Sequence, residues 1–430
     1  MTPGLLLSYY GDDFTGSTDV MEVMQVNGLD TVLFLQPPSG DQLERFAHCR
    51  VIGIAGTSRS QSPEWMSANL PAVFESIRAM GAKLCQYKVC STFDSAPHSG
   101  SIGRALEIGL KVFAPRWVPI VAGAPALGRY TAFGHLFARV GRDVHRIDRH
   151  PTMSRHPVTP MLESDLRLHL AQQTSGKVEL VDILALRRGE VETPAGAALV
   201  DILDEQSLVE AGRLIWTTQP EFMIGSSGIE YALAAYWRSE GMLGAVEPMP
   251  PARSVDRLIV VSGSCSPVTE AQIRWAETNG FAGFRLDAGA MASGDEAASQ
   301  LDPALAALRE GRSVVLYSAL GAPEQSATRE FQHALGRAQG RLLRQLLQRS
   351  GIRRAVVCGG DTSGHACQQL GIYALSVVTP MAPGSPLCRA WSEELDWDGL
   401  EILLKGGQLG REWLFEQVRS GTMPGWTAGA

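Results

Sequence analysis

The strongest constraint on the fold of this chain is a repeated unit: a short apolar run, a turn of glycine and small polar residues, and then the start of a helix. The clearest copy runs from Ala355 through Cys358 into Gly359-Gly360-Asp361-Thr362-Ser363-Gly364. It predicts a buried strand and a helix beginning near Thr362 or Ser363. Adjacent glycines allow a ligand to approach the backbone closely, and the first N–H groups of a helix can hold a phosphate. The alternative is a glycine turn in which Asp361 or Thr362 caps the helix.

Further copies of this unit occur in two series. The first series has apolar runs at residues 5–10, 31–35, 51–55, 84–89 and 118–122, with further strands expected at 178–183 and 222–225. The second series has runs at 258–261, 281–286, 313–318, 355–358, 375–378 and 401–404. Strands that alternate with helices form mostly parallel sheets. The fold class is therefore α/β, with two domains that are each a mostly parallel sheet flanked by helices. A proline-rich stretch without hydrophobic periodicity separates them, so we expect domains at 1–245 and 257–430 and a linker at 246–256.

Length, charge and cysteine usage narrow the class of protein. The chain has 430 residues, too many for one hydrophobic core. Its net charge of -7 without a long basic run argues against a nucleic-acid partner. The seven cysteines form no C-x-x-C pair and are expected to be reduced thiols. No secretory leader or membrane-length apolar run is evident, so a cytoplasmic protein without a membrane partner is expected.

The first turn of the chain carries two adjacent carboxylates, Asp12 and Asp13, within Gly11–Asp19. Like charges this close need a cation, a donor-rich ligand or solvent. In an open parallel sheet, ligands bind beyond the carboxyl ends of the strands, and Thr15 adds a hydroxyl there. Asp13, with Asp12 beside it, is the candidate general base. The alternative is that Asp12 caps the helix and Asp13 is solvated.

Later turns add candidate ligand groups of two kinds. In the first half, Arg59 could hold a carboxylate by a two-point hydrogen bond, or it could be an ordinary surface side chain. In the second half, Ser262–Ser266, Gly359–Gly364 and Lys405–Gly410 follow strands and would offer backbone donors and one cation, Lys405. No Walker, G-x-G-x-x-G or nucleophile-elbow motif is present. The residues alone thus predict two α/β domains, one of which binds phosphate, but no reaction.

Several of these motifs, taken in order, resemble those of the four-carbon acid sugar kinase family. Asp12-Asp13-Phe14-Thr15-Gly16 is similar to its N-terminal signature, and Pro125–Arg129 and Pro157–Asp165 resemble its middle segments. Three further segments resemble the nucleotide-binding turns of the family: Ser262-Gly263-Ser264, Gly359-Gly360-Asp361-Thr362 and Lys405-Gly406-Gly407 through Gly410. The resemblance implies an N-terminal substrate domain, a C-terminal nucleotide domain, and phosphorylation of tetronates such as threonate, erythronate or 3-oxo-tetronate with ATP.

One segment departs from that pattern. The family usually has Asp-Ser-Thr followed shortly by Arg-Gly, whereas this chain has Cys90-Ser91-Thr92-Phe93-Asp94-Ser95. An acid in place of an arginine in a pocket for an anionic sugar acid should change what binds. The alternative is that Asp94 points to solvent.

The resemblance and the residues together give one functional hypothesis. We expect an ATP-dependent kinase of a small sugar acid, tetronate-like or a divergent hydroxy acid, that uses ATP and Mg²⁺ through ligands the sequence does not identify. The alternatives are a non-catalytic sensor of an organic acid and a nucleotide, and a hydrolase or isomerase that uses Ser or Cys; a homodimer is left open. The substrate-binding candidates are Thr15, Gly16, Arg59, Ser91, Asp94 and Arg129. The nucleotide-binding candidates are Ser262, Ser264, Gly359, Gly360, Asp361, Thr362 and Gly407.

Overall fold

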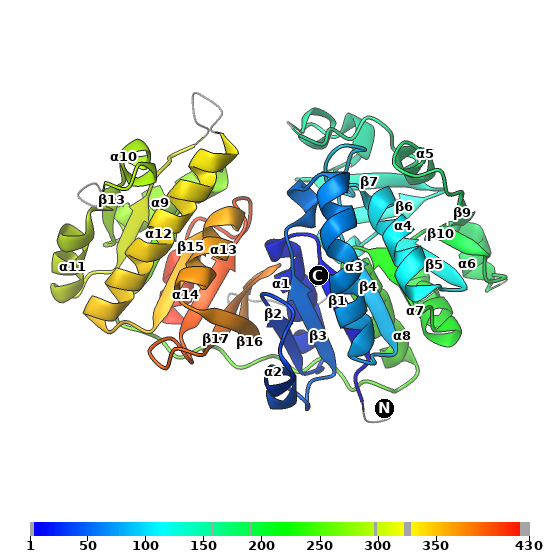
Figure 1. Cartoon of the computed structure of the whole chain (residues 1–430), viewed down its shortest axis with the longest axis horizontal. Coiled ribbons are helices and arrows are strands. Elements are labelled where there is room, and N and C mark those ends of the chain that lie inside the picture. Colours follow the sequence, from blue (N-terminus) through cyan, green and yellow to red (C-terminus); the bar gives the residue numbers. More distant parts are fainter. Residues whose placement is uncertain (1–3, 157, 190, 296–298, 322–327, 422–430) are drawn as a thin grey trace. The chain divides into compact units, whose positions relative to one another are not determined.

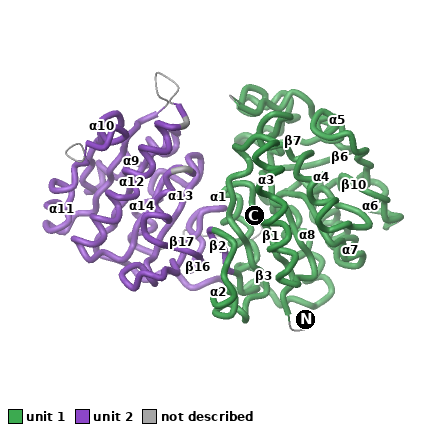
Figure 2. The backbone as a smooth tube through the Cα atoms, viewed as in Figure 1, with its two compact units in different colours: residues 1–31, 36–247, 427–430 green, residues 32–35, 248–426 purple. Residues whose placement is uncertain are grey.

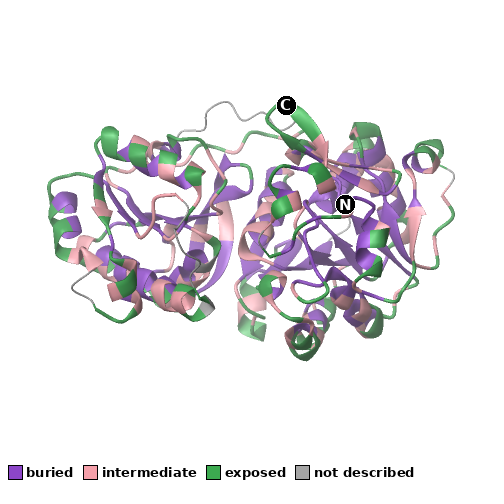
Figure 3. Ribbon diagram, turned by 90° about the horizontal axis from the view of Figure 1, so that it is seen from above, coloured by how far each residue is buried: buried purple, intermediate pink, exposed green. Residues whose placement is uncertain are grey.

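The computed structural model describes residues 4–156, 158–189, 191–295, 299–321 and 328–421 (Figure 1). Pro157 and the side chain of Asp361, both named above, lie outside this description. Within it the chain forms two compact units, residues 4–31 with 36–247 and residues 32–35 with 248–421 (Figure 2). In both units the buried residues are concentrated on the strands (Figure 3).

The first unit is built on a sheet of seven parallel strands. Their order is β3 (Val51–Ala55), β1 (Leu7–Gly11), β4 (Leu84–Lys88), β11 (Met223–Gly225), β5 (Trp117–Val121), β10 (Gly196–Val200) and β9 (Val178–Val181). Because all seven run the same way, their carboxyl ends form a single edge. The turns after β1, β3 and β4 therefore lie beside one another at this edge. These turns carry the catalytic candidate Asp13 and the substrate candidates Arg59 and Asp94.

Most helices of the first unit start at side-chain caps, α8 being the exception among the described residues, and they bury an aromatic core. They are α1 (Phe14–Val26), α2 (Gly40–Arg45), α3 (Pro63–Ala79), α4 (Ile102–Phe113), α5 (Leu166–Ala171), α6 (Ile183–Arg188), α7 (Glu205–Thr218) and α8 (Gly228–Ser239). Ser62 and Ser101, for example, accept the N–H groups of Trp65 and Arg104 at the starts of α3 and α4. Phe74, Phe113 and Phe222 then pack with ring centroids 4.7–6.0 Å apart.

A small antiparallel sheet follows β5 in the chain. Its strands are β6 (Arg129–Ala132), β7 (His135–Val140) and β8 (Asp143–Arg146). Two short 3₁₀ turns follow, Ile147–Arg149 and Met153–Arg155. Alternating residues of β7 bury Leu136 and Ala138, in a pattern too short to stand out in the sequence.

The second unit has a sheet that changes direction. Its order is β13 (Ala282–Arg285), β14 (Val314–Tyr317), β12 (Ile259–Ser262), β15 (Arg354–Cys358), β18 (Glu401–Lys405), β17 (Ser385–Ser392), β16 (Ile372–Ala382) and β2 (Thr31–Phe34). The first five strands are parallel to one another, and the last three pair antiparallel. Its helices are α9 (Pro267–Thr278), α10 (Ala288–Ala292), α11 (Leu301–Arg309), α12 (Arg329–Ser350), α13 (Gly360–Gln369) and α14 (Leu414–Ser420). The predicted fold class is confirmed; β10, β17 and the small sheet were not predicted.

Candidate functional site

Asp13 holds the turn between β1 and α1. It is the N-cap of α1, and its Oδ1 accepts the N–H of Gly16 at 2.7 Å. A Cβ on Gly16 would lie 2.4 Å from that oxygen and 2.9 Å from Nζ of Lys88, so only glycine fits here. Asp13 thus caps the helix and is also partly open to solvent. The alternative in which Asp12 is the cap is wrong.

Asp12 is buried behind this turn. It is 4% exposed, and its Oδ1 has no hydrogen-bond partner among the described residues. Burial and the neighbouring Asp13 carboxylate raise the pKa of Asp12 to about 8, against the opposing pull of Arg59 and Lys88. Burial therefore favours the neutral form of Asp12.

Arg59 joins two carboxylates of this site. It lies in the 3₁₀ turn Ser58–Ser60 after β3. Its Nη1 donates to Oδ2 of Asp13 at 3.1 Å, and its Nη2 donates to both oxygens of Asp94 at 2.9 Å. The side chain is partly buried, so Arg59 is not a free surface residue. Its hydrogen bonds fix the second oxygen of Asp13.

Asp94 lies inside the site and not in solvent. It is 4% exposed, and it also accepts hydrogen bonds from the hydroxyls of Thr92 at 2.5 Å and Thr159 at 3.2 Å. Burial opposes its ionisation, but Arg59 and Thr92 outweigh burial, and the pKa of Asp94 lies below its usual value. Asp94 is thus a charged side chain, and it neutralises the arginine that could otherwise bind a substrate anion.

The other substrate candidates contribute less. Thr15 and Ser91 are partly exposed at the same turns as Asp13 and Asp94. Arg129, at the start of β6, donates its Nη1 to the carbonyls of Leu127 and Gly128 at 2.9 and 3.2 Å. Its guanidinium therefore braces its own turn and is not paired with Asp13 or Asp94.

Sequence reasoning missed the ionisable groups beneath this edge of the sheet. Lys88 ends β4 with its side chain 3% exposed and its Nζ 3.9 Å from Oδ2 of Asp19. Glu230, in the first turn of α8, is fully buried, and burial raises its pKa to about 8. The signal for Lys88 was available: a lysine at the carboxyl end of an otherwise buried parallel strand has few structural reasons to be there.

In the second unit, the predicted nucleotide-binding residues converge after β12, β15 and β18. Ser264 donates its hydroxyl to Oγ1 of Thr269 at 3.1 Å, and Thr269 donates to the carbonyl of Gly407 at 2.9 Å. A Cβ on Gly359, which has φ +114°, would lie 3.4 Å from Oγ1 of Thr362 and 3.5 Å from the nitrogen of Ser264. The three turns are therefore in contact, as adjacent parallel strands require.

Two details of these turns differ from the expectation. Helix α13 starts at Gly360, earlier than predicted, and its N-cap Gly359 makes no side-chain cap. Thr362 donates its hydroxyl to Oε1 of Gln339 at 3.2 Å instead of capping the helix. Lys405 is 1% exposed and donates to Thr269 at 2.8 Å, so this cation braces the Gly407 turn from below. The space beside Gly360 is open: a Cβ there would meet no atom within 4 Å.

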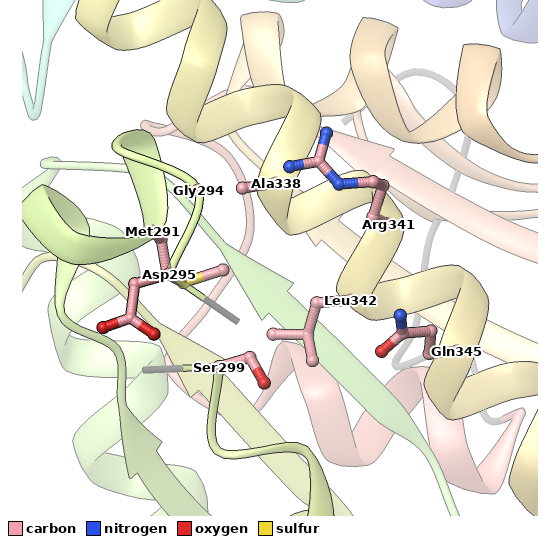
Figure 4. Close-up of a pocket in the computed structure, with 8 residues that line it drawn as sticks. All are labelled: Met291, Gly294, Asp295, Ser299, Ala338, Arg341, Leu342 and Gln345. Atoms are coloured by element: carbon pink, nitrogen blue, oxygen red, sulfur yellow. The ribbon is translucent and has the colours of Figure 1, made fainter. Parts of the chain in front are cut away.

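A small cavity elsewhere in the second unit is separate from these turns (Figure 4). It has a volume of about 30 Å³, room for little more than water. It is lined by Met291, Gly294, Asp295, Ser299, Ala338, Arg341, Leu342 and Gln345, none of which is a predicted nucleotide residue. Across the described residues, no group of three or more His, Cys, Asp or Glu side chains could hold a metal ion. No helix among them is apolar over a length that would cross a membrane.

Comparison with known proteins also divides the chain into two domains with different ligands. Residues 7–233 match the family model described as a sugar-binding N-terminal domain, and residues 259–415 match the nucleotide-binding C-terminal domain. The chain is 49% identical to a 3-oxo-isoapionate kinase of Paraburkholderia graminis, covering 98% of this chain and 96% of the relative. It is 30% identical to a 3-oxo-tetronate kinase of Cupriavidus necator, covering 96% of each. A solved structure from Haemophilus influenzae has the same fold, with a TM-score of 0.71 at 23% identity over 96% of this chain and 99% of that one.

Proposed function

Because the chain belongs to the four-carbon acid sugar kinase family and is a sugar-acid kinase, we propose that its substrate is a 3-oxo sugar acid of the 3-oxo-isoapionate type. Two observations support this choice. Identity is 49% to the 3-oxo-isoapionate kinase and 27–30% to the 3-oxo-tetronate kinases of Cupriavidus necator and Salmonella typhimurium. In addition, Asp94 is hydrogen-bonded to Arg59, so the site presents a carboxylate where the resemblance described above implies an arginine.

The Arg59–Asp94 pair is the observation that carries this proposal. A charged Asp94 holds Arg59 with both oxygens and disfavours a substrate carboxylate at the same place. The sugar acid therefore places its carboxylate away from Asp94. Residues 1–245 form the proposed sugar-acid domain and residues 257–430 the nucleotide domain, joined by 246–256.

Asp13 is the proposed general base. Its two oxygens are held by the N–H of Gly16 and by Arg59, and the side chain remains 29% exposed, so a substrate hydroxyl can reach it. The substrate hydroxyl gives its proton to Asp13 while the hydroxyl oxygen bonds to the γ-phosphorus of ATP. The bond between the γ-phosphorus and the β-phosphate oxygen breaks, and ADP is released. Asp12 is a poorer candidate, since it is buried and its pKa is raised by that burial.

The nucleotide candidates suit phosphate binding through the backbone. The start of α13 offers N–H groups beside Gly360, where a ligand has room. Mg²⁺ fits a kinase of this kind: it is bound by substrate phosphates with one or two carboxylates and water, and needs no protein cage. A cytoplasmic location and a homodimer remain predictions; light scattering would test the latter.

A substrate panel tests the proposal. Purified protein with ATP and Mg²⁺ is assayed for ADP release with 3-oxo-isoapionate, 3-oxo-tetronate, D-threonate and D-erythronate. We expect the highest kcat/KM with 3-oxo-isoapionate. A higher value with any tetronate contradicts the proposed substrate, and nucleotide binding without turnover of any acid would favour the sensor alternative, which no comparison supports.

An Asp94→Asn variant sharpens this test. The amide keeps the shape but loses the charge that occupies Arg59, so we expect kcat/KM for 3-oxo-isoapionate to fall by about tenfold, the loss of one hydrogen bond to a charged group. The ratio of tetronate to isoapionate turnover should rise. Asp148→Asn, which removes another arginine-paired carboxylate of this unit, serves as the control and should leave the ratio unchanged.

A further inference from the structure

Lys88 is a buried cation whose donors are not used. Its side chain is 3% exposed, and its nearest carboxylate oxygen is Oδ2 of Asp19 at 3.9 Å. That distance is too long for a hydrogen bond, and Lys88 makes none with the described residues. An ammonium group has three donors, and leaving them unpaired in a buried place is costly. The arrangement therefore calls for an acceptor that the chain itself does not supply.

The ammonium of Lys88 lies at the floor of the Asp13 turn. It ends β4, where it pairs with Gly11 of β1 and Gly225 of β11. The missing Cβ of Gly16 would lie 2.9 Å from Nζ of Lys88 and 2.4 Å from Oδ1 of Asp13. The ammonium and the proposed base thus lie on either side of the position that a Cβ of Gly16 would take, and a substrate bound at Asp13 is close to Lys88.

The other cations of this region differ from Lys88 in their partners. Arg59 is bonded to Asp13 and to both oxygens of Asp94. Arg129 donates its Nη1 to carbonyls of its own turn, although its Nε has no partner among the described residues. A sugar acid needs a partner for its carboxylate, and Lys88 is a cation beside Asp13 whose ammonium makes no hydrogen bond with the described residues.

The acids around Lys88 leave its charge only partly balanced. Asp19 and Asp13 raise the pKa of Lys88 although burial alone would lower it, so the ammonium stays charged. Glu230 and Asp12 also face it, but burial raises the pKa of each to about 8. Burial thus disfavours the charged form of both acids, which weakens their competition with a bound anion.

Depth sets the orientation of the substrate. The side chains of Asp13 and Arg59 are each 29% exposed, whereas those of Lys88 and Asp94 are 3% and 1% exposed. A phosphoryl group delivered from outside the unit reaches the shallow groups first. We propose that Lys88 binds the carboxylate of the sugar acid, which enters carboxylate first and leaves its reacting hydroxyl at Asp13. This inference rests on the proposed function.

Comparing an acid with its amide tests this role directly. Calorimetry would measure the binding of 3-oxo-isoapionate and of its primary amide to wild type, Lys88→Met and Lys88→Arg. Wild type should prefer the acid by about tenfold or more, the expected strength of one charge-assisted hydrogen bond. Lys88→Met should lose this preference, and Lys88→Arg should retain part of it. Lys111→Met, which removes an exposed lysine of α4, is the matched control and should behave as wild type.

The outcomes separate this inference from the proposed function. If wild type binds the acid with the expected preference but releases no ADP, the kinase assignment fails and the role of Lys88 stands. If Lys88→Met weakens acid and amide equally, or lowers kcat while acid binding is unchanged, Lys88 does not bind the carboxylate. Unchanged ADP affinity and melting temperature in Lys88→Arg exclude a general folding defect as the cause.

Discussion

The candidate sites of the two units consist of different chemical groups. In the first unit, ionisable side chains carry the site: Asp12, Asp13, Arg59, Lys88 and Asp94 are buried or partly buried and set one another's charge. In the second unit, glycines, hydroxyls and helix N–H groups carry it, and the cation Lys405 is turned inward. The difference follows from the ligands. A small hydroxy acid must be oriented and deprotonated, whereas a nucleotide phosphate needs mainly donors that come close.

This contrast predicts that the two sites fail under different kinds of substitution. The first should be sensitive to loss of charge at constant shape. The second should be sensitive to added volume at constant charge. If loss of charge and added volume had equally large effects at each of the two sites, this contrast between the sites would be wrong.

Removing the charge of Asp13 should have the largest effect. Asp13→Asn keeps the carbonyl oxygen that caps Gly16 but cannot accept a proton, so kcat should fall by about 10²–10⁴-fold. Steady-state ADP release measures this. Asp182→Asn is the matched control, because Asp182 caps α6 through the N–H groups of Leu184 and Ala185. If both variants turn over at the wild-type rate, Asp13 is only a cap.

Adding volume at Gly360 should have the next largest effect, on the nucleotide. Gly360→Val places a branched side chain in the open space at the start of α13, so ADP affinity should fall by about 10–100-fold, equivalent to about 1.4–2.8 kcal/mol. Gly364→Val, one turn later in the same helix and also unobstructed, is the control. Equal calorimetric affinities for the two variants would place the nucleotide elsewhere.

Much of this division could be predicted from the sequence. The strand–turn–helix units placed Asp13, Arg59 and Asp94 at adjacent turns, because parallel strands bring their carboxyl ends to one edge. The glycine turns of the second unit were equally visible. Hydrophobic periodicity does not show which side chains pair with each other. It does not show that Arg59 is shared by Asp13 and Asp94, or that Lys405 points inward, because these depend on side-chain packing between distant segments.

Lys88 and Asp12 show a second limit. Both are polar residues at strand ends, and local sequence does not reveal that one is 2% and the other 4% exposed. Strand β17 was missed for a related reason. Its sequence contains Pro386 and Arg389, which argue against a central strand, but it pairs antiparallel with both neighbours. Tertiary pairing outweighs local preference there.

Stability should respond to pH through Asp12. Its folded pKa is raised from 3.8 to about 8, so the folded state keeps a proton that the unfolded state releases. Stability from this group is complete below pH 3.8 and is lost progressively up to about pH 8. Asp12→Asn cannot ionise and so avoids this loss of stability. The difference in melting temperature between the variant and wild type should therefore grow from pH 4 to pH 8, by roughly 2–4 °C for each kcal/mol of unfolding free energy that wild type loses. Asp182→Asn should show no such trend, and a constant difference for Asp12→Asn would mean that Asp12 is ionised in the folded state.

Loss of one hydroxyl in the second unit should have the smallest effect. Ser264 donates to Thr269, which supports the carbonyl of Gly407, but Thr269 also accepts from Lys405. The turn therefore keeps a brace in Ser264→Ala, and backbone donors remain in place. ADP affinity should fall by less than about tenfold, the cost of one ordinary hydrogen bond. Calorimetric titration of this variant beside Gly360→Val decides the point: a loss at Ser264 as large as that at Gly360 would mean that side chains, and not the backbone, hold the phosphates.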